Sequence, residues 1–143
     1  MTTPHRPLLD TQATCSCGAA TLTVNGPVLS MLLCTCLDCQ KETGTGHSAV
    51  ALVKAADVEV SGTLSAFARP AASGATTTRH FCPQCGVTLY AQSSRAEQTM
   101  LIPAGLLGGD WFVPNQVIFA RSHADWDTLP DTIPRYETYR EGL

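Results

Sequence analysis

Alternating polar and apolar positions recur along the chain and predict β-strands. In residues 20–26, Thr21 and Thr23 alternate with Leu22 and Val24, and the segment ends at the turn dipeptide Asn25-Gly26. Short strands are also expected at 47–53, 57–60, 64–70, 99–105 and 116–122, and as two extended arms around a tight turn within 76–92. The expected fold class is therefore mainly β.

One short helix and an irregular tail complete this pattern. The helix is expected over residues 37–44, because Gly44 and Gly46 then break it. Prolines punctuate the segment 125–140, so the tail from about residue 127 is expected to wrap the surface, anchored by Trp126. No long linker divides the chain, which predicts a single domain over residues 1–143.

Composition narrows the classes of partner. Charged residues make up 15% of the chain, the net charge is −3, and Lys or Arg form no run, which argues against nucleic acid or an acidic membrane as partner. The longest apolar runs fall far below the roughly 18 residues of a spanning helix. The segment 1–10 lacks the apolar core of a secretory signal, so the cytoplasm is the expected compartment.

Seven cysteines are the strongest chemical signal. They are spaced as two pairs and a set of three: Cys15 and Cys17, Cys34, Cys36 and Cys39, and Cys82 and Cys85. In a secreted protein they would suggest a disulfide framework with one cysteine left over. In a reducing cytosol, clustered cysteines at these spacings favour metal binding.

Two of these groups can form a closed zinc site. Cys82 and Cys85 flank a tight turn followed by Gly86, so both thiolates can reach one metal. Cys15 and Cys17 would share a face in an extended strand and need a second pair. The preferred site therefore combines Cys15, Cys17, Cys82 and Cys85 around a structural zinc. In the alternative, Cys15 and Cys17 join two of the other three cysteines.

The preferred division leaves Cys34, Cys36 and Cys39 as a local set of three thiolates. Three protein ligands leave the fourth position of a zinc ion open to water or substrate, the arrangement of catalytic zinc. The alternatives are that His47 or another residue closes the site, or that the cysteines are simply reduced. Two zinc ions per chain are expected, and the occupancy of the second site is left open.

Other residues offer weaker signals. His47 follows a flexible Gly-Thr-Gly segment and could approach the metal or a substrate, although a surface histidine is the simpler interpretation. His80 is expected on a strand surface. Arg79, Arg121 and Trp126 are candidates for holding an extended or carboxylate-bearing ligand. No Ser/His/Asp set, phosphate loop or pair of carboxylates stands out.

The order of the cysteine motifs resembles a known family. The motifs are Cys-Ser-Cys-Gly (15–18), Cys-Thr-Cys-Leu-Asp-Cys-Gln-Lys (34–41) and Arg-His-Phe-Cys-Pro-Gln-Cys-Gly (79–86). In this order they resemble the glutathione-dependent formaldehyde-activating enzymes, a family that includes centromere protein V. Weaker similarities at 61–67, 102–111 and 114–126 extend the resemblance over almost the whole chain.

The resemblance implies a β-tent fold of packed antiparallel sheets around zinc–cysteine sites. It implies a structural zinc at the four cysteines and a second zinc at the three. The implied activity is condensation of glutathione with formaldehyde to S-hydroxymethylglutathione, formally a carbon–sulfur lyase reaction. Many relatives carry His and Arg where this chain has Thr35 and Gln40. If that Arg holds an anionic peptide, this contact is missing here, and the exact substrate stays open.

Three hypotheses for function follow. The first is a zinc-dependent enzyme acting on a small-molecule thiol or aldehyde adduct, with glutathione as one candidate. The second is a non-catalytic, zinc-stabilised binding module. The third, a zinc ribbon that binds nucleic acid, fits poorly with the acidic balance. The oligomeric state is left open.

Overall fold

Ten strands and two short α-helices occur in residues 5–142, the part of the chain that the computed structural model describes. The expected domain limits at residues 1 and 143 lie outside it. The strands are β1 (Leu8–Thr14), β2 (Thr21–Pro27), β3 (Ser30–Cys34), β4 (Ser48–Lys54), β5 (Val58–Ser61), β6 (Ser65–Pro70), β7 (Thr76–Phe81), β8 (Thr88–Ser93), β9 (Thr99–Pro103) and β10 (Gln116–Ile118). The helices are α1 (Leu37–Thr43) and α2 (Ala104–Leu107), with single 3₁₀ turns at Ala55–Asp57 and Ala120–Ser122.

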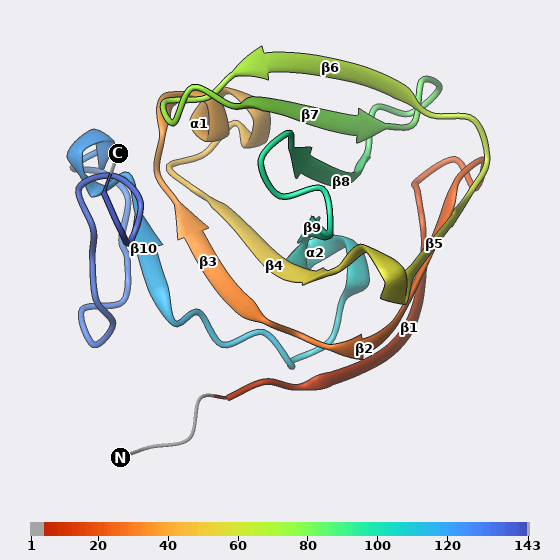
Figure 1. Ribbon diagram of the computed structural model, residues 1–143, viewed down its shortest axis with the longest axis horizontal. Coiled ribbons are helices and arrows are strands. Elements are labelled where there is room, and N and C mark those ends of the chain that lie inside the picture. The colour runs from red at the N-terminus through yellow and green to blue at the C-terminus, as the bar shows by residue number, and fades with distance from the viewer. Residues whose placement is uncertain (1–4, 143) are drawn as a thin grey trace.

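The strands form two sheets, which confirms the expected mainly β class. One sheet has the order β1-β2-β5, and the other has the order β10-β3-β4-β9-β8-β7-β6. All of these pairings are antiparallel except β10 with β3, which is parallel. Figure 1 shows the larger sheet curving so that β6 and β7 lie on one side of the molecule and β3 and β4 on the other. The β-tent name stays an expectation from the family resemblance.

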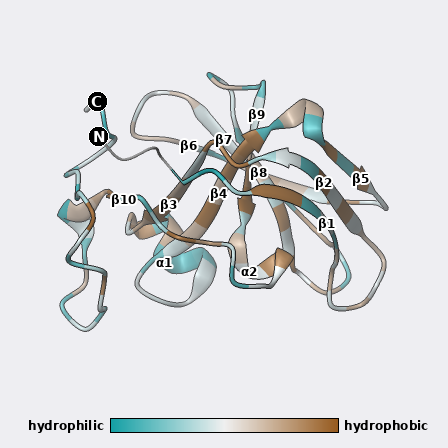
Figure 2. Cartoon of the chain, turned by 90° about the horizontal axis from the view of Figure 1, so that it is seen from below, coloured by the Kyte–Doolittle hydropathy of each residue, from teal (hydrophilic) through white to brown (hydrophobic). Residues whose placement is uncertain are grey.

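A shared core joins the two sheets. The alternation in β2 places Leu22 and Val24 fully inside, while Thr21 and Thr23 remain half-buried, as the sequence predicted. Apolar positions concentrate on strands such as β1, β3 and β4 (Figure 2). The core continues across the larger sheet through Met31, Ala51, Val53, Leu89 and Ile102.

Several elements were not predicted. β1 and β3 lie outside the expected strands, although both carry apolar positions that become buried, such as Leu9 and Met31. The segment 99–105 ends its strand at Pro103 and turns into α2, and 116–122 forms only three residues of strand before a 3₁₀ turn. These changes occur where the chain leaves a sheet, and local alternation carries no information about that point.

Helix α1 forms where the sequence predicted a helix. Cys36 caps its N-terminus, because the Cys39 backbone N–H donates to the Cys36 Sγ at 3.3 Å. At the other end Gly44 N–H donates to the Gln40 carbonyl at 2.9 Å and ends the helix. None of the described helices is long and apolar enough to span a lipid bilayer.

The tail follows the surface beside β10, but its expected anchor is wrong. Trp126 is 70% exposed, whereas Leu129 is 7% exposed and packs with Leu33 and Val117. Backbone hydrogen bonds fasten the same segment: Val117 N–H donates to the Pro134 carbonyl, and Tyr136 N–H donates to the Val117 carbonyl, both at 2.9 Å. Leu129 is the anchor because its side chain packs inward against Val117 of β10.

Truncating the two tail side chains should therefore have opposite outcomes. We expect Leu129→Ala to lower the free energy of unfolding by about 2–3 kcal/mol, because it leaves a cavity in a packed cluster. Trp126→Ala should change it by no more than about 0.5 kcal/mol, as an exposed substitution does. Chemical denaturation followed by circular dichroism measures both. A larger loss for Trp126→Ala than for Leu129→Ala would contradict this tail packing.

Candidate metal centres and the adjoining cavity

Four cysteines far apart in the sequence lie together beside the core. The sulfur atoms of Cys15, Cys17, Cys82 and Cys85 all lie within 4.8 Å of one another. The Cys15 and Cys17 sulfurs are 3.7 Å apart, and those of Cys17 and Cys82 are 3.6 Å apart. A tetrahedron of thiolates around zinc, with Zn–S near 2.3 Å, requires sulfurs about 3.8 Å apart. The cluster therefore has the dimensions of a closed zinc site.

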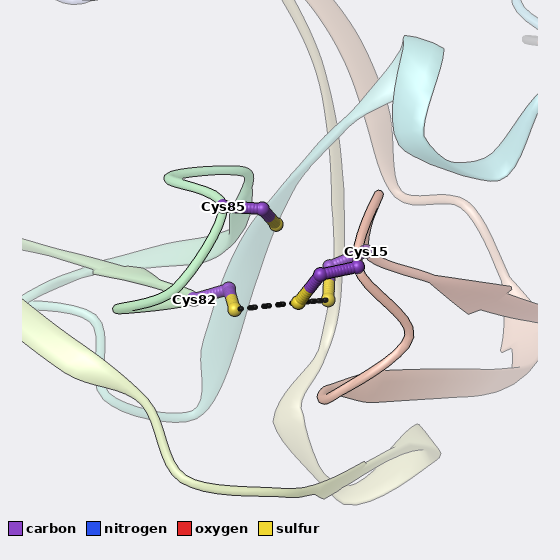
Figure 3. A group of neighbouring side chains, drawn as sticks. Cys15, Cys82 and Cys85 are labelled. Carbon is purple, nitrogen blue, oxygen red and sulfur yellow. Dashed lines mark hydrogen bonds between the residues drawn. The ribbon is translucent and has the colours of Figure 1, made fainter.

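Two tight turns supply these sulfurs. Between β7 and β8, Gly86 N–H donates to the Cys82 carbonyl at 2.8 Å, and Gly86 takes a φ of 80° that favours glycine. After β1, Gly18 N–H donates to the Cys15 carbonyl at 3.1 Å. Cys15 and Cys17 are thus brought together by a turn, which corrects the expected extended strand. Figure 3 shows Cys82 and Cys85 facing Cys15 from the opposite turn.

The four cysteine sulfurs favour a bound cation. Burial opposes a charged sulfur at Cys15, but the Ala20 N–H, 3.3 Å from the sulfur, and the adjacent thiols lower the pKa of Cys15 to about 6. At Cys17 the Ala19 N–H favours the thiolate, yet burial and the neighbouring sulfurs raise the pKa of Cys17 to about 12. The Val87 N–H also lowers the pKa of Cys85, so a thiolate is favoured at Cys15 and Cys85 and opposed at Cys17. A bound cation would stabilise all four thiolates together, and zinc is a metal that four thiolates suit.

The other three cysteines form a separate cluster at the start of α1. The Cys34, Cys36 and Cys39 sulfurs also lie within 4.8 Å of one another. Cys34 ends β3, Cys36 caps α1 and Cys39 lies in the first turn of the helix. Contacts with the Cys34 and Cys39 sulfurs keep the pKa of Cys36 far below its ordinary value, whereas contacts with Cys36 and Cys39 raise the pKa of Cys34. This cluster could also hold a metal ion, with three sulfur ligands.

A cavity of about 530 Å³ opens beside the three-cysteine cluster. All three cysteines line it, whereas none of the other four does. Its walls come mainly from α1 and from strands of the larger sheet. The lining side chains used below are Leu32, Val50, Phe67 and Pro103, with Asp38, Lys41, Glu42, Arg69 and Arg79 as the charged ones.

Two ion pairs connect α1 to the strands across this cavity. Arg69 Nη1 lies 3.3 Å from Asp38 Oδ2, and Arg79 Nε lies 3.7 Å from Glu42 Oε1. Asp38 and Glu42 stand four residues apart and so share one face of the helix. Arg79 was a predicted candidate for ligand binding, whereas Arg69 was not. Alternation along β6, which puts Phe67 and Arg69 on one face, was the available signal.

Thr35 and Gln40 have structural partners. The buried Thr35 hydroxyl donates to the Phe119 carbonyl at 2.6 Å. The Gln40 side-chain amide donates to the Thr35 and Ser122 carbonyls, both at 2.9 Å. Neither residue lines the cavity. Gln40, the residue after the third cysteine, therefore fastens the cluster to the segment after β10 and is not part of the cavity wall.

The remaining candidate residues lie away from the sulfur clusters. His47 Nδ1 is 2.7 Å from Asp127 Oδ2, so this residue connects the segment between α1 and β4 to the tail. His47 belongs to neither cysteine cluster. Arg121 lies over the Phe119 ring at 5.5 Å, and neither Arg121 nor Trp126 lines the cavity. His80 is on β7 and stacks on Tyr90 with ring centroids 4.4 Å apart, partly shielded from solvent.

Fold and site together define a mainly β protein with two cysteine clusters, one beside a cavity. A family model described as glutathione-dependent formaldehyde-activating enzyme matches residues 10–122, and the chain belongs to this family. A crystal structure of a Rhodobacter sphaeroides protein is similar in fold, with a TM-score of 0.56 and 17% identity, over 87% of this chain and 99% of that one. The search of curated proteins found no match.

Proposed function

We propose that the chain is a zinc-dependent enzyme acting on the adduct of a thiol and an aldehyde, formally a carbon–sulfur lyase. In this proposal Cys15, Cys17, Cys82 and Cys85 hold a structural zinc. Cys34, Cys36 and Cys39 hold a second zinc at the reaction site, and the chain folds as one domain.

One observation carries the proposal: the cluster with only three sulfurs is the one that lines the cavity. A closed four-cysteine site has no position for a substrate, and here the four-cysteine cluster lies outside the cavity lining. A three-ligand site beside a cavity of about 530 Å³ has room for a substrate. Family membership supports the same reaction class.

The reaction requires a sulfur nucleophile and a polarised carbonyl. Zinc, when bound, lowers the pKa of a thiol and withdraws electron density from a carbonyl oxygen. In the addition, the thiol sulfur forms a bond to the aldehyde carbon, the C=O π pair moves to oxygen, and the thiol proton ends on that oxygen. The chain's residues hold the three sulfurs in place through the α1 cap and the Gln40 amide, and the cavity walls keep bulk water from part of the substrate.

The test is the rate of adduct exchange. Zinc-loaded protein, a low-molecular-weight thiol and formaldehyde are mixed, and NMR exchange spectroscopy measures formation and breakdown of the adduct. We expect exchange faster than the uncatalysed background and faster than with an equal concentration of free zinc chloride. Exchange at background with both zinc ions bound would contradict the enzyme and leave a non-catalytic zinc-stabilised module.

A further inference from the structure

We propose that the cavity selects a thiol substrate with an apolar body and a carboxylate at its far end, and that Arg69 and Arg79 bind this carboxylate. The proposal rests on the proposed function of the three-cysteine cluster and adds the chemical class of the substrate. It follows from the cavity's size, the character of its walls and the loose pairing of the two arginines.

The cavity is much larger than the smallest substrates of this reaction class. A water molecule occupies about 30 Å³ of liquid, and formaldehyde has only two heavy atoms. A volume of about 530 Å³ instead lies in the range of sites that enclose molecules of drug size. Most of the space must therefore take the body of the thiol partner.

The wall on one side of this space is an apolar row across three neighbouring strands. Leu32 on β3 pairs with Val50 on β4, and Val50 pairs with Pro103 on β9, so the three side chains stand on the same face of the sheet. All three line the cavity. Peptide amides placed against this row would lose water without gaining hydrogen-bond partners from it. An apolar body suits the row better than a peptide such as glutathione.

Phe67 supplies an apolar surface on β6. Its side chain lines the cavity, yet the residue is 56% exposed, which makes it one of the most exposed large apolar residues described. Phe67 pairs with Arg79 on β7, and Arg69 follows two residues later on the same face. An apolar group covering Phe67 would therefore lie directly beside both guanidinium groups.

The two arginines are available for a better acceptor. Charge-assisted N–H···O contacts are ordinarily about 2.7–2.9 Å long. Here the Arg69–Asp38 and Arg79–Glu42 contacts are 3.3 and 3.7 Å, and the Arg79–Thr88 contact is 3.5 Å. Both arginine side chains keep about a quarter of their surface exposed, 25% and 29%. A planar carboxylate can accept two parallel hydrogen bonds from a guanidinium group, which these pairs do not achieve.

Positive charge in the lining comes from Lys41, Arg69 and Arg79. These cations exceed the carboxylates Asp38 and Glu42 by one, an excess that three thiolates holding one Zn²⁺ would offset, so attraction for an anion is local to the two guanidinium groups. Arg69 contacts Asp38, which directly precedes Cys39 on α1, so one guanidinium group lies beside the helix turn that carries the cysteines. A carboxylate at the arginines and a sulfur at the cysteines can thus belong to one molecule.

The experiment is equilibrium binding of matched thiols to the zinc-loaded protein by titration calorimetry. The probes are ω-mercaptooctanoate, its uncharged methyl ester and glutathione, and the variants are Arg79→Met and Arg69→Met. Lys54→Met is the matched control, because it removes the same charge from an exposed residue at the end of β4, outside the cavity lining. Circular dichroism verifies that each variant is folded.

We expect ω-mercaptooctanoate to bind at least about tenfold more tightly than its ester, because a charge-assisted hydrogen bond contributes about this much binding free energy. It should exceed glutathione by a similar factor, because the apolar wall offers peptide amides no hydrogen-bond partners. Arg79→Met should abolish the preference for acid over ester, and Lys54→Met should preserve it. If the wild type binds acid and ester equally, the proposal that the arginines bind a carboxylate is wrong, and the variants are not needed to show it. Tighter binding of glutathione would overturn the apolar substrate class.

The two proposals fail in different ways. If ω-mercaptooctanoate shows the expected preference but its formaldehyde adduct is not turned over, the binding site stands and the catalytic proposal fails. If adducts of all three probes are turned over with equal efficiency and equal affinity, the catalytic proposal stands and the substrate class is wrong.

Discussion

Replacing Cys82 with serine is expected to unfold the chain. Cys82 is fully buried among core residues and lies 3.6 Å from the Cys17 sulfur, so its side chain belongs to both the core and the four-cysteine cluster. A structural zinc contributes about 10 kcal/mol or more to folding, comparable with the roughly 5–15 kcal/mol stability of a whole domain. Loss of one ligand should remove most of this contribution. Circular dichroism and zinc content per chain measure the result.

The same reasoning predicts the effect of removing the metal. Titrating a strong chelator into the wild type should first remove the zinc ion from the cluster beside the cavity, since one position of a three-ligand zinc is open to competing ligands. Loss of β-structure should coincide with release of the second zinc ion, from the four-cysteine cluster. A Cys82→Ser variant that stays folded and retains two zinc ions would contradict the structural role of this cluster.

Cys36→Ser should give the opposite result: a folded protein without activity. Cys36 caps α1 by accepting the Cys39 N–H, and a serine hydroxyl is itself a favoured N-cap group. The substitution therefore keeps the helix start and removes only a metal ligand. We expect unfolding free energy to change by less than about 1 kcal/mol, zinc to fall from two ions to one, and thiol–aldehyde exchange to return to background.

Each cysteine variant serves as the control for the other. Both exchange one sulfur for oxygen, so a general effect of losing a thiol would appear in both. Metal analysis, denaturation and NMR exchange on the same preparations separate the two clusters. Full exchange activity in Cys36→Ser would contradict the catalytic role of the three-cysteine cluster, whatever its zinc content.

Local features of the chain were predictable because their causes are local. The alternation of Leu22 and Val24 with threonines determines which side of β2 is buried, and Cys36 and Gly44 delimit α1 through contacts within a few residues. Tight spacing also makes the sulfurs of Cys34, Cys36 and Cys39 neighbours in the chain before any tertiary contact forms. Their role as zinc ligands stays a prediction, and so does the role of the other four.

The cavity and the pairing of charges across it were beyond sequence reasoning. Arg69 and Arg79 come from β6 and β7, and their partners Asp38 and Glu42 lie on a helix 31 and 37 residues earlier. The same holds for Gln40, whose amide contacts Ser122 across 82 positions of sequence. No local pattern records which distant segments will be neighbours. Trp126 shows the reverse error, because an aromatic residue predicts burial only where the fold provides something to cover it.

The sequence by itself therefore determined the mainly β class, the helix at residues 37–43 and the family, through short-range periodicity and ordered cysteine motifs. Only the tertiary structure decided that the three-cysteine cluster opens onto a cavity, that the four-cysteine cluster does not, and that two arginines face the same space. The physical reason is that a cavity is a property of packed sheets, and sheet packing brings together residues whose separation along the chain carries no signal.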